Sequence, residues 1–403
     1  MQPVSQLILY RIKAQWRAVP NVVKHQITSL AVALTYLLLL PASITGRLES
    51  GLLGEWFSLR GSRPVPRSVA VVRIDTATYT RMQIPLDGML SREFIAETIE
   101  RIAAGGAKLI VVDLVFLAEG INKEADARLA QALANSPSVI AEGLSVNETA
   151  DASGTKRSVV EKKVPIKLFA TRAKGVLLTQ ARFEHNDRME RIALSDALMV
   201  SSDVHVPLVT PLRQYVSATL KEPAEYDLIN YYGEPPSLTG VSLVDVIDSS
   251  RGVSSDYFRD RVVFIGTATD GVQGFAENGD RVAVPVSRKP MYGVEVLATI
   301  AANVLDQTWL RRLPPGMERF ALGLLSWVCT LMILALSMRR SAAFAACAIT
   351  AWGLASYSAF VWAFYFIPGA MVFAVLLPLV LLAKWLVERR LPRDVFIAKP
   401  KSV

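Results

Sequence analysis

The chain has 403 residues, of which 52% are hydrophobic and 20% are charged, so it is too apolar for two ordinary soluble domains and part of it is expected in lipid. Its net charge of +8 would suit a nucleic-acid-binding protein if the charge were spread over a folded domain. Residues 48–318 instead contain 30 basic and 34 acidic side chains, and the flanks contain 14 basic and 2 acidic ones. Because the basicity belongs to the flanks, no nucleic-acid partner is expected.

Four apolar stretches are long enough to cross a bilayer, whose core requires about 20 residues of helix. They cover residues 27–47, 319–338, 341–363 and 367–387. The last two are separated near Phe366-Ile367-Pro368-Gly369, where proline and glycine end a helix. A cleaved signal peptide is the alternative interpretation of the first stretch, and the central block is exported in either case.

Lys and Arg predict the orientation of these spans, because they concentrate on the cytoplasmic side of membranes. The basic leader 1–26, the pair Arg339-Arg340 and the basic tail 388–403 are therefore expected in the cytoplasm. The turn between the third and fourth spans has aromatic residues and no basic ones, which is typical of the opposite interface. Residues 48–318 then form an extracytoplasmic domain. The cytoplasmic segments are too short for a folded output domain.

The first half of the extracytoplasmic domain has the pattern of an α/β fold. Residues 68–74 and 109–112 are rich in Val and Ile, as in strands that are buried on both faces. Between them, a helix starts with Ser91 as its N-cap and ends at Gly105-Gly106. A second helix over 123–134 precedes a strand at 139–141. Two consecutive βαβ units predict a mixed, largely parallel sheet.

The second half is less regular. Residues 143–163 predict a hairpin or a solvated loop, a short helix is expected after Pro211, and further strands are expected at 175–179, 190–195, 226–231 and 261–265. A closing helix over 294–305 has one apolar face. It leads through Pro314-Pro315 into the second span, and a stiff proline pair would transmit a shift of the domain to that span.

Polar residues follow three of the predicted strands, at the positions where an open parallel sheet binds its ligands. The candidate ligand-binding residues are Asp75, Asp113, Gly266, Thr267, Thr269 and Asp270. Carboxylates beside a glycine-rich loop could bind a cation or a small polar molecule. The competing interpretation is that the aspartates cap loops or helix starts.

Residues that support catalysis or metal binding are scarce. The three histidines, His25, His185 and His205, have no second ligand at zinc spacing. Cys329 and Cys347 both lie in apolar stretches, so the exported domain has no disulfide and no thiolate metal site. The glycine-rich loop has Val272-Gln273 where a phosphate loop has its Lys and Ser or Thr. We therefore expect no enzyme, no cofactor and no metal, with a hydrolase that uses Asp75 and Asp113 as the open alternative.

The third span carries Ala351, Ala355 and Ala359 at the small-xxx-small spacing that lets another helix approach closely. This ridge is a candidate contact with a membrane protein partner or with a second copy of the chain. The competing interpretation is that it packs on the second or fourth span of the same chain.

Seven segments carry a family resemblance by their order. They are VAVVRIDTATYTRM at 69–82, KLIVVDLVF at 108–116, Asp126-Ala-Arg-Leu129, DLINYYGEPPS at 227–237, VSLVDVID at 241–248, FRDRVVFIGTATDG at 258–271 and PMYGVEVLATIAANVL at 290–305. With one span before them and three after, they resemble the CHASE2 domain, an extracytoplasmic sensory module of bacterial receptors.

The resemblance implies a sensory module, which in that family usually controls a cytoplasmic cyclase or kinase and whose ligand is generally unassigned. This chain is expected to depart from the family in having no output domain. Gly274-Phe275-Ala276 stand where an aspartate often follows the glycine-rich loop, and a histidine often found in the last helix is replaced near Leu297. Both departures count against a ligand site of the family's type in this chain.

We therefore expect a multi-pass sensor of the bacterial inner membrane, with its large domain in the periplasm and both termini in the cytoplasm. The domain would recognise an envelope signal, of which a small ligand is one form, and pass it to a separate partner protein. The alternative is a structural or assembly subunit of an envelope membrane complex.

Overall fold

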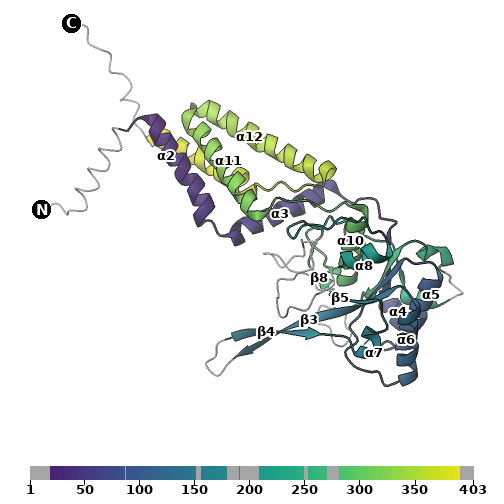
Figure 1. The fold of residues 1–403 in the computed structure, drawn as a ribbon. Helices are drawn as coiled ribbons and strands as arrows, with labels where there is room; N and C mark the ends of the chain where they lie inside the picture. Colours follow the sequence, from purple (N-terminus) through teal and green to yellow (C-terminus); the bar gives the residue numbers. More distant parts are fainter. Residues whose placement is uncertain are drawn as a thin grey trace, which may run out of the picture. The chain divides into compact units, whose positions relative to one another are not determined.

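The computed structural model describes residues 19–86, 88–150, 156–178, 190, 208–248, 253–269 and 281–390. The chain divides into two compact units. One is Leu53–Arg312, and the other combines Met1–Leu52 with Leu313–Val403. Figure 1 shows that the first unit contains a sheet with helices and that the second consists of helices.

The α/β unit is built on a seven-stranded sheet with the order β4-β3-β2-β7-β1-β6, in which β5 also pairs with β3. Its strands are β1 (Val69–Ile74), β2 (Leu109–Asp113), β3 (Ser138–Ala150), β4 (Lys156–Lys163), β5 (Gly175–Leu178), β6 (Gly240–Ser242) and β7 (Val262–Thr267). Every neighbouring pair is parallel except β3 and β4. The predicted mixed, largely parallel sheet is confirmed. Two short strands, β8 (Arg281–Val282) and β9 (Met291–Tyr292), form a separate antiparallel pair.

Helices cover both faces of this sheet (Figure 1). They are α4 (Thr76–Arg81), α5 (Arg92–Ala104), α6 (Lys123–Asn135), α7 (Lys167–Ala170), α8 (Val209–Tyr215), α9 (Leu243–Ile247), the 3-10 turn η2 (Ser255–Phe258) and α10 (Gly293–Asp306). On one face, Ile110 and Val112 form a core with Ile99 of α5 and Leu129 of α6. The alternate strand residues are equally buried on the α10 face, which explains the continuous runs of Val and Ile.

The ends of α5 lie where the sequence predicts them. The Ser91 hydroxyl accepts a hydrogen bond from the Glu93 amide at 3.3 Å, which satisfies a free N–H of the first turn. At the other end, Gly105 is the C-cap and Gly106 has a φ of +81°, a conformation that glycine adopts without a steric penalty.

The hairpin predicted for 143–163 is confirmed. β3 continues beyond the strand predicted at 139–141 and pairs with β4. In this register Gly143 lies opposite Lys163 at one end, and Ala150 lies opposite Lys156 at the other. The strand predicted at 175–179 is β5, the one at 261–265 is β7, and the closing helix is α10. The strand predicted at 190–195 falls outside the described residues except for Glu190.

The strand predicted at 226–231 is wrong. Within this stretch, Leu228 alone forms a bridge, to Leu310. The amide of Asn230 donates to the side chain of Asn303 at 2.7 Å, and its carbonyl accepts from the side chains of Asn303 and Arg63. Because side chains satisfy these backbone groups, the segment is held without a strand ladder.

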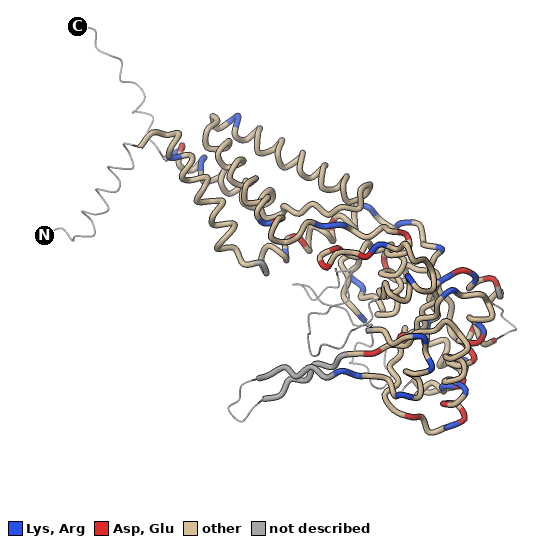
Figure 2. The backbone as a smooth tube through the Cα atoms, in the orientation of Figure 1, with Lys and Arg blue, Asp and Glu red and all other residues tan. Residues whose placement is uncertain are grey.

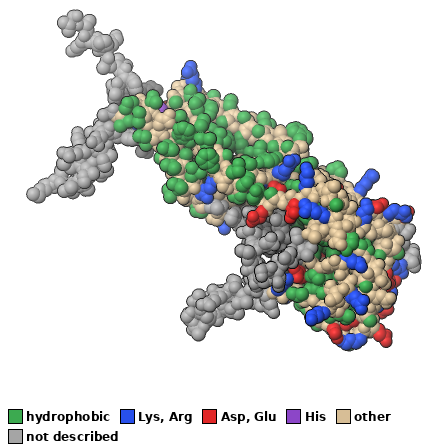
Figure 3. Space-filling model, in the orientation of Figure 1, with side chains coloured by type: hydrophobic (Ala, Val, Ile, Leu, Met, Phe, Trp, Pro, Cys, Tyr) green, Lys and Arg blue, Asp and Glu red, His purple; other side chains and the backbone are tan. Residues whose placement is uncertain are grey.

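The second unit contains four helical stretches that are long and apolar enough to cross a membrane, among the residues that the structure describes: Asn21–Leu39, Pro315–Ala335, Met338–Ala363 and Met371–Arg389. Its elements are α2 (Asn21–Leu34), the π-helix η1 (Thr35–Leu39), α3 (Ala42–Arg60), which continues into the α/β unit, α11 (Pro315–Ala335), α12 (Met338–Ser358), the π-helices η3 (Ala359–Ala363) and η4 (Met371–Leu376), and α13 (Leu377–Arg390). Figure 2 shows few charges on these helices, and Figure 3 shows hydrophobic side chains over their visible surface.

The first of these stretches ends earlier than the expected range 27–47. Its helix stops at Leu39, Leu40 is extended, and α3 starts at Ala42. Pro41 lies at the break and has no N–H to continue the helical hydrogen bonds. The break expected near Phe366–Gly369 lies between η3 and η4, where the Ser356 hydroxyl donates to the Ile367 carbonyl at 2.8 Å.

Candidate functional site

The strand order brings the candidate residues to one edge of the sheet. β7 lies between β1 and β2, so Asp75, Asp113 and the loop after β7 follow three neighbouring parallel strands. In the register of the sheet, Gly266 lies between Asp113 of β2 and Arg73 of β1. This juxtaposition depends on the late strand β7, which enters the sheet between the first two strands of the domain.

Asp75 is the N-cap of α4. Its Oδ1 atom accepts hydrogen bonds from the Thr78 amide at 3.0 Å, the Thr78 hydroxyl at 3.0 Å and the Ser242 hydroxyl at 2.7 Å. The next residue, Thr76, bonds through its hydroxyl to that of Thr269 at 3.0 Å. Asp75 therefore ties α4 and β6 together, and the Thr76–Thr269 bond ties the start of α4 to the loop after β7.

Asp113 and Gly266 lie side by side beneath the start of α10. A Cβ atom added to Gly266 would lie 2.7 Å from the Cβ of Val294 and 3.3 Å from the Cβ of Asp113. Glycine is required here because α10 approaches the sheet closely. Thr267 and Thr269 are buried. Asp270, together with His185, His205 and Val272-Gln273, lies outside the described residues.

A buried ion pair that the sequence pattern did not predict lies next to this edge. Arg73 donates from Nε and Nη2 to Oε1 of Glu295 at 3.0 and 2.7 Å, and from Nη2 to the Leu238 carbonyl at 3.2 Å. The Glu295 side chain is 2% exposed, and its Oε2 atom has no hydrogen-bond partner among the residues that the structure describes. The sequence does contain a signal for this pair. Arg73 is a charged residue within the apolar run of β1, and Glu295 is one within the apolar start of α10, and charged residues in such positions are buried only when paired.

The loop that follows Asp113 is fixed by a second buried pair. Arg92 donates to the carboxylate of Asp126 and to the carbonyl of Ala118, and the amide of Gly120 donates to Oδ2 of Asp126 at 2.8 Å. Burial raises the pKa of Asp126, but the hydrogen bonds from Arg92 and Gly120 and the nearby positive charges outweigh it and lower the pKa overall.

This lowered pKa predicts a pH dependence. The folded state favours the carboxylate, so its contribution to stability is present above the unfolded pKa of about 4 and is lost as the pH falls through the lower folded value. Asp126→Asn should cost about 1.5–3 kcal/mol at pH 7 and flatten the loss of stability below about pH 4. Denaturant midpoints from pH 7 to pH 2 would measure this. Asp256→Asn is the matched control, because Asp256 pairs with Arg259 and both side chains are largely exposed; an equal effect of the two variants would contradict the assignment.

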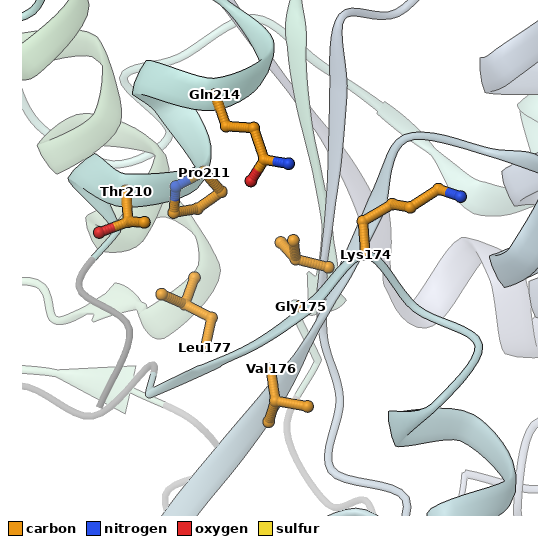
Figure 4. Close-up of a pocket in the computed structure, with 8 residues that line it drawn as sticks. Lys174, Gly175, Val176, Leu177, Thr210, Pro211 and Gln214 are labelled. Atoms are coloured by element: carbon orange, nitrogen blue, oxygen red, sulfur yellow. The ribbon is translucent and has the colours of Figure 1, made fainter. Parts of the chain in front are cut away.

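A small pocket of about 130 Å³ lies elsewhere, between the β3–β5 pair and α8 (Figure 4). Its lining residues come from those elements and from Lys174, which directly precedes β5. They are Val139, Lys174, Gly175, Val176, Leu177, Thr210, Pro211 and Gln214. The lining is mostly apolar, and the Lys174 ammonium donates to the Ala134 carbonyl at 3.1 Å. The pocket shares no residue with the candidate edge. Among the described residues, no three His, Cys, Asp or Glu side chains are grouped to hold a metal ion.

The ridge predicted on the third span lies on α12 and η3. Ala351 and Ala355 are exposed and Ala359 is half-buried. The surrounding face of α12 also exposes small residues, namely Ala342, Ala343, Ala346, Cys347 and Thr350. Most of this face is therefore not covered by the described part of the chain.

These features define a membrane protein with an α/β domain between its first and second apolar helices. A protein-family comparison matches the CHASE2 domain over residues 28–336, from within α2 to just beyond α11. The chain therefore belongs to the CHASE2 family, whose members are sensory extracellular domains and not catalytic ones. No curated protein and no solved structure matches the chain.

Proposed function

We propose that this protein is a multi-pass membrane sensor whose CHASE2 domain recognises an envelope signal and passes it to a separate partner protein within the membrane. The family supports the sensory part of this proposal. The proposal of a partner rests on the face of small residues on α12, most of which the described part of the chain does not cover.

The proposed placement puts residues 48–318 in the periplasm of a bacterial inner membrane and both termini in the cytoplasm. The excess of basic over acidic residues in the flanks supports it. A short tag at position 200 should be accessible once the outer membrane is permeabilised, whereas tags at residues 1 and 403 should be accessible only after the inner membrane is also opened. Accessibility of all three tags from the same side would contradict the placement.

The α12 face differs from the other lipid-facing surfaces of the helical unit. The other spans expose large hydrophobic residues, including Leu34 and Leu38, Phe320 and Leu324, and Leu382 and Leu386. Within α12, Leu354 is the one large hydrophobic residue that is exposed to a similar extent as those residues. Small side chains let a second helix come close enough for extensive van der Waals contact, which drives helix association in lipid.

Cys347 allows a direct test of this contact, because it is exposed on the α12 face while Cys329 is buried in α11. A thiol-directed crosslinker applied to native membranes should join Cys347 to another membrane protein. Ala351→Leu with Ala355→Leu should abolish the adduct by filling the ridge.

The matched control for this crosslink uses another lipid-facing position. In a Cys347→Ala background, Leu382→Cys on α13 places an exposed thiol outside the ridge and should give no adduct. An adduct of two copies of the chain would replace the separate partner by a homo-oligomer, and the absence of any adduct at Cys347 would contradict lateral signalling through α12.

We further infer that a small polar ligand of the domain binds at the strand-end edge that carries Asp113, Gly266, Thr267 and Thr269. Asp270, which follows Thr269 in the sequence, remains a candidate by its sequence position alone. The arrangement of three neighbouring strand ends supports this location. Asp75 would act indirectly, because its Oδ1 atom caps α4. If an envelope compound raises the melting temperature, Asp113→Ala should remove the rise, whereas Asp75→Ala should lower melting with or without the compound.

A further inference from the structure

Two chain segments connect the α/β unit to the first and second membrane spans, and both contact one buried stretch, Asp227–Tyr232. The first is the C-terminal half of α3, which follows the first span. The second is α10 with the residues after it, which precede α11. We call the stretch 227–232 the central segment.

The end of α3 is bonded to the central segment. Arg60 donates from Nη1 to Oδ1 of Asn230 and from Nη2 to the Tyr231 carbonyl, both at 2.5 Å. The rings of Phe57 and Tyr231 meet edge to face with centroids 5.9 Å apart. Beyond α3, the Arg63 amide donates to the Tyr232 carbonyl at 2.6 Å. Four contacts therefore fix the last turn of α3 and the chain just after it.

The end of α10 is bonded to the same segment. The Asn303 side chain accepts from the Asn230 amide at 2.7 Å and donates to the Asn230 carbonyl at 3.2 Å. The Asn230 side chain donates to the Thr308 carbonyl at 2.7 Å. Two backbone hydrogen bonds of 2.8 and 3.0 Å then join Leu228 to Leu310, four residues before Pro314.

Asn230 is the residue that joins the two sides. Its side-chain oxygen accepts from α3, its side-chain nitrogen donates to the chain after α10, and its backbone amide and carbonyl bond to α10. Asn230 and Asn303 are both fully buried. Movement of α3 relative to α10 would leave a buried polar group without a partner, which is unfavourable.

We propose that the central segment is a coupling clamp, which holds the end of α3 and the end of α10 as one body, so that the domain acts on the first and second spans together. The mechanical connection between α3 and α10 does not depend on the proposed sensory function. Only the direction of the signal, from the domain to the spans, rests on that function. The alternative is that each connecting segment moves independently of the other.

Hydrogen exchange of the full-length chain in lipid nanodiscs tests the clamp. Asn303→Ala, on α10, should make the amides of Phe57–Arg60 exchange about tenfold faster. Arg60→Met should have the reciprocal effect on the amides of 299–306. In an Asn230→Ala background, neither substitution should change the exchange of the other side any further. Arg60→Lys keeps the positive charge but loses the bidentate contact. It should therefore increase the exchange of the amides of 299–306 less than Arg60→Met does.

Ser138→Ala is the control, because the buried Ser138 hydroxyl bonds to Ser136 and to the Leu133 carbonyl, at β3 and the end of α6. It should leave the exchange of both connecting segments unchanged. The clamp is overturned if Asn303→Ala affects α10 alone and Arg60→Met affects α3 alone. This result does not depend on the Cys347 crosslink, so failure of the proposed function would leave it unchanged.

Discussion

Arg73→Met should destabilise the α/β unit by about 3–5 kcal/mol, because it leaves the carboxylate of Glu295 buried without its cation. The Arg73 and Glu295 side chains are 17% and 2% exposed, and the two groups approach to 2.7 Å. Methionine fills most of the arginine stem, so the loss reports mainly the unpaired charge. Equilibrium unfolding in denaturant, followed by tryptophan fluorescence, would measure the effect.

The double variant Arg73→Met with Glu295→Leu separates the charge from its packing. An apolar pair of similar volume can replace a buried ion pair at little or no cost, so the double variant should recover most of the lost stability. Arg81→Met is the control, since Arg81 and Asp245 form a pair whose side chains are 28% and 32% exposed and which should contribute about 0–1 kcal/mol. A double variant as unstable as Arg73→Met would rule out this account.

Gly266→Ala should destabilise the protein by about 1–3 kcal/mol, because the new methyl group would overlap Val294 and force α10 away from the sheet. The overlap involves the Cβ atom of Val294 at 2.7 Å, which a change of rotamer cannot move. Thermal unfolding of the full chain would show the loss. Loosening of α10 should also speed hydrogen exchange over its first turn.

Gly175→Ala provides a control with the opposite expected sign. Gly175 also lies in a strand, but a Cβ atom there would be 3.5 Å from Val139, at ordinary contact distance. Because glycine in a strand costs about 0.5–1 kcal/mol relative to alanine, this substitution should be neutral or stabilising. Equal destabilisation by the two variants would show that the close approach of α10 is not what requires Gly266.

The fold assigns different roles to the two aspartates of the candidate ligand site. Sequence position alone left Asp75 and Asp113 equivalent, as two carboxylates after buried strands. In the structure, one oxygen of Asp75 accepts two hydrogen bonds from Thr78 of α4 and one from Ser242 of β6, whereas Asp113 lies beside Gly266 under α10. The two residues therefore have different expected effects, on stability for Asp75 and on ligand binding for Asp113.

The central segment shows where pattern-based prediction fails. Its apolar and aromatic residues favoured a strand, because such residues are enriched in strands. Asn230 interrupts that pattern, but a sequence does not show that Arg60, Asn303 and Thr308 lie around it. Side-chain hydrogen bonds between residues so far apart in the chain form only in the folded protein.

The sequence by itself determined the elements that depend on local chemistry. Ser91 and the Gly105-Gly106 pair determined the ends of α5, the Val and Ile runs determined β1 and β2, and the uncharged stretches determined the apolar helices, because capping, side-chain periodicity and hydropathy act within a few residues. Tertiary structure alone decided that β7 lies between β1 and β2, that Arg73 meets Glu295 and that Asn230 joins α3 to α10. These pairings follow from the packing of distant segments, which no local pattern encodes.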